Sequence, residues 1–397
     1  MRPVTTPKYW RPVLASGPMR ILGAYAVAVS LVAAFFTAGI LLGGFRAVER
    51  SDYMTYQVAA RLVLQGDGDC LYTVDCQAAE QRELIGEEPT FARGALPYNS
   101  PPWLAALLVP LGVLPLHLAF GIFTILSLAL LADATWRATS GAAVAKLVAA
   151  ALLLTAWPTV MGAIRGQSTI AVVGLLGISV FGSGAALGLS TVKPTLGPLW
   201  AAWLVLARRW RELGIALAVT AALIVLSAVV VSPQALLDYP AHLLGVAAPD
   251  ALGVHPEEMV NWRGAATRLG AGSWLIAAGT AVTLVLVAVT WVRSPSPALA
   301  AAAAFIATPL VIPHANQHEA ILAAFGVLLA IGAAAPPIRS RLAAAAVATH
   351  AIVWVGPAMP AEASAWLLFA AMLAWLVQTC VIAVRWRPGE ASKPLSP

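Results

Sequence analysis

Long apolar runs separated by short polar joints dominate the chain. A helix that crosses the hydrocarbon core of a membrane needs about 20 apolar residues, so runs of this kind predict transmembrane helices. The uninterrupted runs lie at 19–43, 118–136, 147–164, 168–182, 212–232, 273–292, 297–313, 318–334, 342–357 and 363–384. The pattern predicts an all-α, polytopic membrane protein.

Two further apolar stretches are interrupted. Residues 101–116 contain Pro110, and residues 184–207 contain the pair Lys193-Pro194. Each stretch is either one span or two half-helices that meet at a break, because proline disturbs a helix interior. With these stretches, the sequence predicts roughly 10–12 transmembrane elements.

Composition agrees with a membrane protein. Of the 397 residues, 60% are hydrophobic and 11% are charged, and the mean hydropathy is +0.82. Soluble domains carry about 25% charged residues, so an ordinary soluble enzyme and a disordered chain are excluded. The basic residues are too scattered for a nucleic-acid-binding face. The run at 19–43 is too long for a secretory signal core, and we interpret it as a retained membrane anchor.

The distribution of basic residues predicts the orientation, since Lys and Arg are enriched on the cytoplasmic side. It predicts a cytoplasmic N-terminus and C-terminal tail, and places the long loops near 46–100 and 233–272 outside. Only three of the 18 acidic residues then lie inside, namely Asp133, Glu212 and Glu390. The basic joints that we place inside contain Arg137, Lys146, Arg208, Arg209, Arg211, Arg293, Arg339, Arg341 and Arg385.

This orientation constrains the interrupted stretches. Only the span 118–136 separates the loop 46–100 from the next basic joint, so 101–116 should enter and leave the membrane on one side. The same argument makes 184–207 a hairpin with its Lys-Pro pair at the outer tip. The alternative is that the interrupted stretches are two full spans, which would violate the positive-inside tendency at 137–146. We treat 1–397 as a single integral membrane domain with a first helix at 19–43, a first outer loop at 46–100, core helices in 101–232, a second outer loop at 233–272, C-terminal helices in 273–384 and a tail at 385–397.

The cysteines fit an oxidising outer side. Cys70 and Cys76 both lie in the first outer loop, close enough in sequence to form a disulfide. Two free thiols are the alternative, because sequence does not give the geometry that a disulfide requires. Cys380 lies in an apolar run and is interpreted as a packing residue.

Asp52 is the first candidate for catalysis. It follows the first predicted span, so its backbone is anchored while its carboxylate stays at the outer surface. A carboxylate there can act as a general base on a substrate hydroxyl, whereas the alternative is a solvated loop acid. The spacing of apolar residues over 56–66, ending at Gly66, predicts a short interfacial helix directly behind it.

Two basic positions are candidates for binding an anion. Arg165 and Gln167 lie where one span ends and the next begins, and a helix N-terminus facing outward favours anions. Lys193 is flanked by apolar residues and needs water, an acid or an anionic ligand such as phosphate. The alternatives are a tight turn with a solvated arginine, and a lysine that extends to the membrane surface.

Polar residues recur in two later outer segments. Asn261 lies in the second large loop, and His314, His318 and Glu319 lie between two spans. The second histidine of a zinc-protease helix is absent, as is the Gly-Lys-Ser/Thr of a phosphate-binding loop. We therefore expect no metal and no cofactor, and polar capping of two helices is the alternative interpretation.

The order of these features resembles the polytopic GT-C glycosyltransferases, specifically glycosyltransferase family 87, over about residues 20–335. This family includes polyprenyl-phosphate-mannose-dependent α-mannosyltransferases. The matching residues are Ser51-Asp52-Tyr53, Tyr56, Ala59-Ala60, Gly66, Leu71-Tyr72, Tyr98 to Trp103, Pro110-Leu111, Leu114-Pro115, Gly166-Gln167-Ser168, Lys193-Pro194, Arg208 to Arg211, Asn261 and Pro313 to Glu319.

The resemblance implies an inverting sugar transfer at the outer face of the plasma membrane. The donor would be a polyprenyl-phosphate sugar, most often mannose, and the acceptor a glycolipid or glycan. Asp52 would be the general base, and Lys193, Arg165 and Gln167 would bind the donor phosphate. Substrate-binding roles would fall to Tyr56, Tyr98, Asn261, His314, His318 and Glu319.

One departure concerns the later loop. Members of the mannosyltransferase branch often carry a His pair or a Tyr-Asp pair near the position of His318-Glu319. Three alternatives to a sugar transferase of this kind are a lipid-linked polysaccharide polymerase or ligase, a secondary transporter and a non-catalytic membrane scaffold. A transporter fits less well, since the sequence has no internal repeat and its polar residues gather on one side instead of at the membrane centre.

Overall fold

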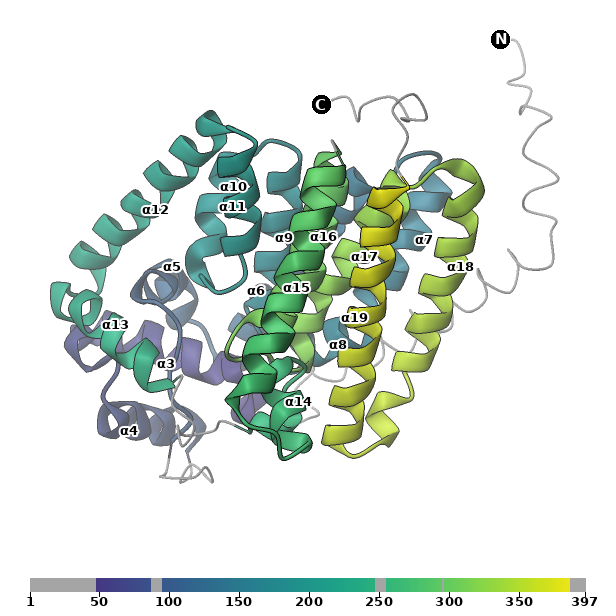
Figure 1. Ribbon diagram of the computed structural model, residues 1–397. Coiled ribbons are helices and arrows are strands. Elements are labelled where there is room, and N and C mark those ends of the chain that lie inside the picture. The colour runs from purple at the N-terminus through teal and green to yellow at the C-terminus, as the bar shows by residue number, and fades with distance from the viewer. Residues whose placement is uncertain (1–47, 87–94, 247–254, 295, 386–397) are drawn as a thin grey trace, which may run out of the picture.

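The computed structural model describes residues 48–86, 95–246, 255–294 and 296–385. Every regular element within these ranges is a helix, which confirms the predicted all-α architecture (Figure 1). The predicted first span at 19–43 and most of the tail at 385–397 lie outside the described residues.

Long apolar helices form the membrane-spanning part. Five stretches are long and apolar enough to cross a bilayer, and the pair α7 (Ala143–Leu154) and α8 (Trp157–Ile164), bent by 57°, makes up to six. At 1.5 Å per residue, such helices match a hydrocarbon core of about 30 Å. The five are α6 (Leu116–Ala138), α12 (Trp210–Val230), α15 (Ser273–Arg293), α19 (Ala361–Val384) and Ile338–Ala358, which contains most of α18 (Pro336–Val353).

Four apolar helices are shorter than a membrane span, namely α5 (Pro102–Gly112), α9 (Thr169–Val180), α16 (Pro297–Val311) and α17 (Ala320–Ala333). Every residue of α16 from Leu299 to Leu310 is buried, and α16 packs against α15, α17 and α19. A helix surrounded by protein need not match the bilayer thickness, because its neighbours replace the lipid. The apolar runs therefore predicted helices correctly, but in the described residues fewer than the expected 10–12 have the length of a full span.

The two interrupted stretches differ. Residues 184–207 form a helical hairpin of α10 (Gly184–Leu189), η4 (Ser190–Val192) and α11 (Pro198–Leu206), with Lys193 in the connecting turn. Gly188 allows α10 to touch α12, since a Cβ there would lie 2.7 Å from the carbonyl oxygen of Ala216. By contrast, 101–116 holds one helix, α5, which continues through Pro110 and packs against α3 and α12.

The loop near 46–100, predicted to lie outside, folds into η1 (Val48–Arg50), α3 (Asp52–Gln65), η2 (Gly68–Cys70) and α4 (Val74–Ile85) in its described residues. Gly66 ends α3 in the left-handed conformation at φ 87°, as expected. The helix starts four residues before the predicted 56, and Asp52 belongs to its first turn, where a carboxylate is favourable. Most of α3 is buried between α5 and α6, so it is less exposed than an interfacial helix.

The loop near 233–272, also predicted to lie outside, contains the short helices α13 (Pro233–Val246), η5 (Pro256–Glu258) and α14 (Trp262–Arg268). Two further 3-10 helices, η6 (Gln317–Glu319) and η7 (Gly356–Ala358), lie in the connections before α17 and α19.

The connections separate into two ends of the bundle (Figure 1). At one end, Trp157 donates to the Gln317 side chain and Trp354 donates to the carbonyl oxygen of Thr155. This end also carries α3, α4, α13 and α14. The opposite end carries the connections after α6, α9, α11, α15, α17 and α19, which hold nearly all the basic joints recognised in the sequence.

Candidate functional site

Asp52 is positioned by a close contact between α3 and the turn that joins α8 to α9. The Tyr53 N–H donates to the carbonyl oxygen of Arg165 at 3.3 Å. Gly166 has φ +62°, and a Cβ there would lie 2.4 Å from the Tyr53 Cβ and 2.8 Å from a ring carbon of Phe120. Only glycine supplies both this backbone conformation and this close approach. The turn therefore brings the start of α3 against the start of α9.

Gln167 connects the base candidate with the cation candidate. Its Nε2 donates to the Asp52 carboxylate, and its Oε1 accepts from Lys193 Nζ at 3.5 Å. The Gln167 side chain is buried, whereas Asp52 is half-buried. An amide between a carboxylate and an ammonium group has one favourable orientation, since its N–H must face the acid. Gln167 thereby fixes the two charged groups relative to each other.

Lys193 is held from two further sides. Its ammonium group donates to Thr169 Oγ1 at 2.7 Å and to the Glu319 carboxylate. Glu319 is buried and also accepts from His318 Nε2 at 2.8 Å and from the Asn316 N–H at 2.7 Å. The buried carboxylate is therefore paired with a cation and hydrogen-bonded, as a buried charge requires.

These contacts fix the charge states at this end of the bundle. Burial alone would lower the pKa of Lys193, but the adjacent Glu319 carboxylate outweighs it and raises the pKa above its usual value. Burial alone would raise the pKa of Glu319, but His318 and Lys193 together hold it below its usual range. Lys193 is therefore an ammonium group and Glu319 a carboxylate at neutral pH.

The two predicted tyrosines have different positions. The Tyr56 hydroxyl lies 3.3 Å from Ser168 Oγ, so it borders the cluster of Asp52 and Gln167. Tyr98 is fully buried, donates to the carbonyl oxygen of Pro101 at 2.8 Å and packs edge-on against Tyr56 with 6.3 Å between ring centroids. Tyr98 therefore packs against the Tyr56 ring and helps to hold it in place.

Asn261, just before α14, and His314 both contact the connection that leads from α16 to Glu319. Asn261 is buried, caps α14 and donates to the carbonyl oxygen of Ile312 at 2.8 Å. His314 Nε2 lies 3.2 Å from Asn316 Nδ2, and its Nδ1 is buried with no hydrogen-bond partner in the described part of the chain. Both residues hold the connection between α16 and η6 in place.

The remaining predicted positions are Arg165 and the three cysteines. The Arg165 side chain is exposed, and its carbonyl oxygen is the part of the residue that contacts α3. Cys70 and Cys76 are joined by a disulfide with a Cα–Cα distance of 5.9 Å, which links η2 to the start of α4. Cys380 is buried in α19.

The structure adds residues that the sequence did not single out for a role. Thr169 bonds to both Lys193 and Glu319, and Ser168 meets Tyr56. They are the next two residues after Gln167, so the motif Gly166-Gln167-Ser168 was the signal that pointed to this segment. Their side chains are buried and reach the cluster because α9 begins there.

Comparison with protein families gives one match, to the model of glycosyltransferase family 87, over residues 98–313. This match covers more than half of the chain. The chain belongs to glycosyltransferase family 87. It is therefore a membrane glycosyltransferase, as the resemblance in its motifs implied.

The matched region of this family 87 glycosyltransferase contains Gln167, Lys193 and Asn261. Asp52 precedes the match, and Glu319 follows it by a few residues. Comparisons with curated proteins and with solved structures give no significant match. Within the described residues, no group of three or more His, Cys, Asp or Glu side chains could hold a metal ion.

Proposed function

We propose that this glycosyltransferase moves a sugar, with mannose as the first candidate, from a polyprenyl-phosphate donor to a glycolipid or glycan acceptor. The reaction takes place at the extracytoplasmic face of the plasma membrane. The observation that carries the proposal is the Gln167 side chain, which joins Asp52 to Lys193. A base and a phosphate-binding cation thereby belong to one site, as a displacement at a sugar phosphate requires.

Asp52 serves as the general base. Its Oδ2 accepts from Gln167, and its Oδ1 accepts the proton of the acceptor hydroxyl. The acceptor oxygen attacks the anomeric carbon as the bond from that carbon to the phosphate oxygen breaks. The electron pair of this bond leaves with the phosphate, and the anomeric configuration inverts.

Lys193 receives the phosphate. Of its three ammonium contacts, those with Thr169 and Glu319 are close, whereas the one with Gln167 is long at 3.5 Å. A phosphate oxygen can replace the contact with Gln167 with the smallest loss of hydrogen-bond energy, because this contact is the weakest of the three. The first N–H groups of α9 add positive potential near the same place, since the helix begins at Thr169.

An apolar cavity beside Lys193 supports a lipid-linked donor. It has a volume of about 210 Å³ and lies between α10, α11 and α12. Pro194, the neighbour of Lys193, lines it together with Leu187, Ala201, Ala216 and Leu217. Apolar surface of this kind favours an isoprenoid chain by about 25 cal/mol per Å² buried. The polar side chains of its lining are the hydroxyl groups of Ser190, Thr191 and Thr220, and no charged residue lines it.

The arrangement of charge supports an extracytoplasmic site. The basic joints, which the positive-inside tendency assigns to the cytoplasm, gather at the end of the bundle opposite Asp52. The disulfide between Cys70 and Cys76 lies in the loop at the Asp52 end and fits an oxidising compartment.

The test is a donor screen on purified protein in lipid nanodiscs. Polyprenyl-phosphate-mannose and the corresponding glucose, galactose and arabinose donors are each supplied with a glycolipid acceptor, and products are identified by mass spectrometry. We expect transfer of a single sugar from one polyprenyl-phosphate donor, and its loss in Asp52→Asn. Transfer from GDP-mannose only would overturn the lipid donor. Long polymeric products would favour the polymerase alternative.

A further inference from the structure

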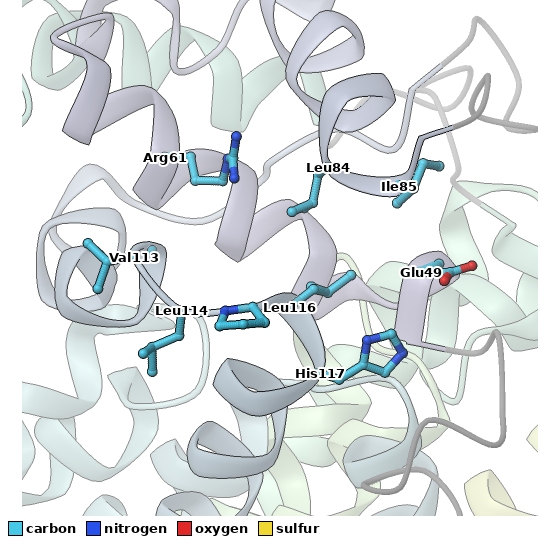
Figure 2. A pocket seen from close by; sticks show the side chains of 10 residues that line it. Glu49, Arg61, Leu84, Ile85, Val113, Leu114, Leu116 and His117 are labelled. Atoms are coloured by element: carbon cyan, nitrogen blue, oxygen red, sulfur yellow. The ribbon is translucent and has the colours of Figure 1, made fainter.

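A second cavity lies between the helices of the first outer loop and the connection from α5 to α6. Its volume is about 390 Å³, within the roughly 300–1,000 Å³ of small-ligand sites. Residues of η1, α3, α4 and the turn between α5 and α6 line it. Figure 2 shows Glu49 and His117 at one end of this cavity and Arg61 near the other, with Leu84 between them.

The floor of this cavity is rigid. Gln57, a buried residue of α3, donates its side-chain amide to the carbonyl oxygens of Leu111 at 3.2 Å and Leu114 at 2.9 Å. Gly112 allows the turn to approach α3, since a Cβ there would lie 2.9 Å from a methyl group of Leu64. A floor fixed in this way presents a preformed surface, which reduces the entropy lost on binding a ligand.

The charges around the cavity disfavour an anion. Arg61 already forms ion pairs with Glu80 and with Glu83. Glu49 is the one carboxylate among the lining residues of this cavity. Because the Arg61 guanidinium group is already paired with two carboxylates, it is a poor partner for a phosphate, whereas a neutral ligand rich in hydroxyl groups needs no unpaired cation. The site therefore differs in kind from the one at Lys193.

Glu49 and His117 have the chemistry to recognise hydroxyl groups. The carboxylate accepts two or more hydrogen bonds, and the imidazole ring can donate from one nitrogen and accept at the other. Both side chains are half-buried, so their polar ends remain accessible. The C–H face of a sugar ring can pack against the apolar side chains of Leu84 and Leu114, which line the cavity.

The cavity also lies close to Asp52. Only two residues separate Glu49 from Asp52, so their Cα atoms are at most about 11 Å apart. Ser51 donates its hydroxyl to the carbonyl oxygen of Val48 at 2.7 Å, which fixes the short connection. A saccharide seated against Glu49 can therefore extend to the proposed base.

We infer that this cavity binds the saccharide part of the acceptor, and that Glu49 and His117 hydrogen-bond its hydroxyl groups. The inference rests on the proposed function, because it assigns the second substrate of the same reaction. The acceptor saccharide then lies next to the start of α3, which carries the proposed base Asp52. The two residues set acceptor affinity and take no part in the transfer step.

The test measures steady-state transfer from polyprenyl-phosphate-mannose to octyl α-mannoside and to octyl α-dimannoside. In Glu49→Ala and His117→Ala we expect the acceptor KM to rise by about 2- to 10-fold each, the range for one hydrogen bond. The donor KM and the slow donor hydrolysis without acceptor should keep their wild-type values. Val113→Trp, at an exposed position that lines the cavity, should raise the acceptor KM by filling it.

His255→Ala is the matched control, since His255 is an exposed histidine in the second outer loop and does not line the cavity. Thermal unfolding in detergent monitors folding of every variant. Unchanged acceptor KM values in the folded Glu49, His117 and Val113 variants would overturn the inference while leaving the proposed function intact. A wild-type protein that uses none of the polyprenyl-phosphate donors would overturn the proposed function itself.

Discussion

Gly166→Ala should disable the enzyme through a displacement of Asp52. An alanine at φ +62° carries a backbone penalty of about 1–2 kcal/mol. Its Cβ would also lie 2.4 Å from the Tyr53 Cβ, about 1 Å inside the usual limit of contact. Overpacking of this kind adds about 1–3 kcal/mol, so the start of α3 should shift to relieve it.

A shift of about 1 Å in a catalytic group lowers the rate on the order of 10²-fold. We therefore expect Gly166→Ala to reduce kcat by about that factor, measured with a polyprenyl-phosphate donor in nanodiscs. Gly270→Ala is the control, since Gly270 has a similar φ of +60° and nothing within 4 Å of its added Cβ. Equal activity of the two folded variants would refute the reasoning, because it would show that the contact with Tyr53 does not position Asp52.

Three other predictions follow from the cluster and the topology. Asp52→Asn should lower turnover by about 10²–10⁴-fold, whereas Asp67→Asn, at an exposed position, should not; stopped-time transfer assays give both values. Lys193→Ala should raise the donor KM, and Lys193→Arg should not fully restore it, because a planar guanidinium group does not reproduce the geometry of the ammonium contacts with Thr169 and Glu319; an unchanged donor KM in the Ala variant would show that Lys193 does not bind the donor phosphate. Glu83→Cys should react with an impermeant thiol reagent in intact cells and Trp210→Cys should not, and the reverse pattern would place the site in the cytoplasm.

The sequence determined the class of the molecule and the identity of several residues at its site. Apolar runs predict helices whether lipid or protein surrounds them, because both environments require internal satisfaction of backbone hydrogen bonds. Asp52, Gln167 and Lys193 were recognisable because a charged or polar group among apolar residues needs a partner or a function. The order of the motifs indicated glycosyltransferase family 87, and the match to the model of this family agrees.

Tertiary structure alone decided which of these residues meet. The contact between Lys193 and Glu319 joins residues that are far apart in the chain, and only the packing of the hairpin against α9 and η6 brings them together. Tyr98 matched the family pattern as well as Tyr56 did, yet it is fully buried behind Tyr56. Sequence spacing carries no information about which of two similar side chains reaches Ser168, beside the cluster of Asp52 and Gln167.

Helix length and cavity position were also decided in three dimensions. The run that became α16 reads as a span in the sequence, but its neighbours enclose it and it ends after 15 residues. Neither cavity has a local sequence signal, since each is lined by segments that come from three or more helices or turns. Local sequence patterns determine whether a segment forms a helix. The position of a cavity depends instead on how side chains from several helices pack together, which only the tertiary structure decides.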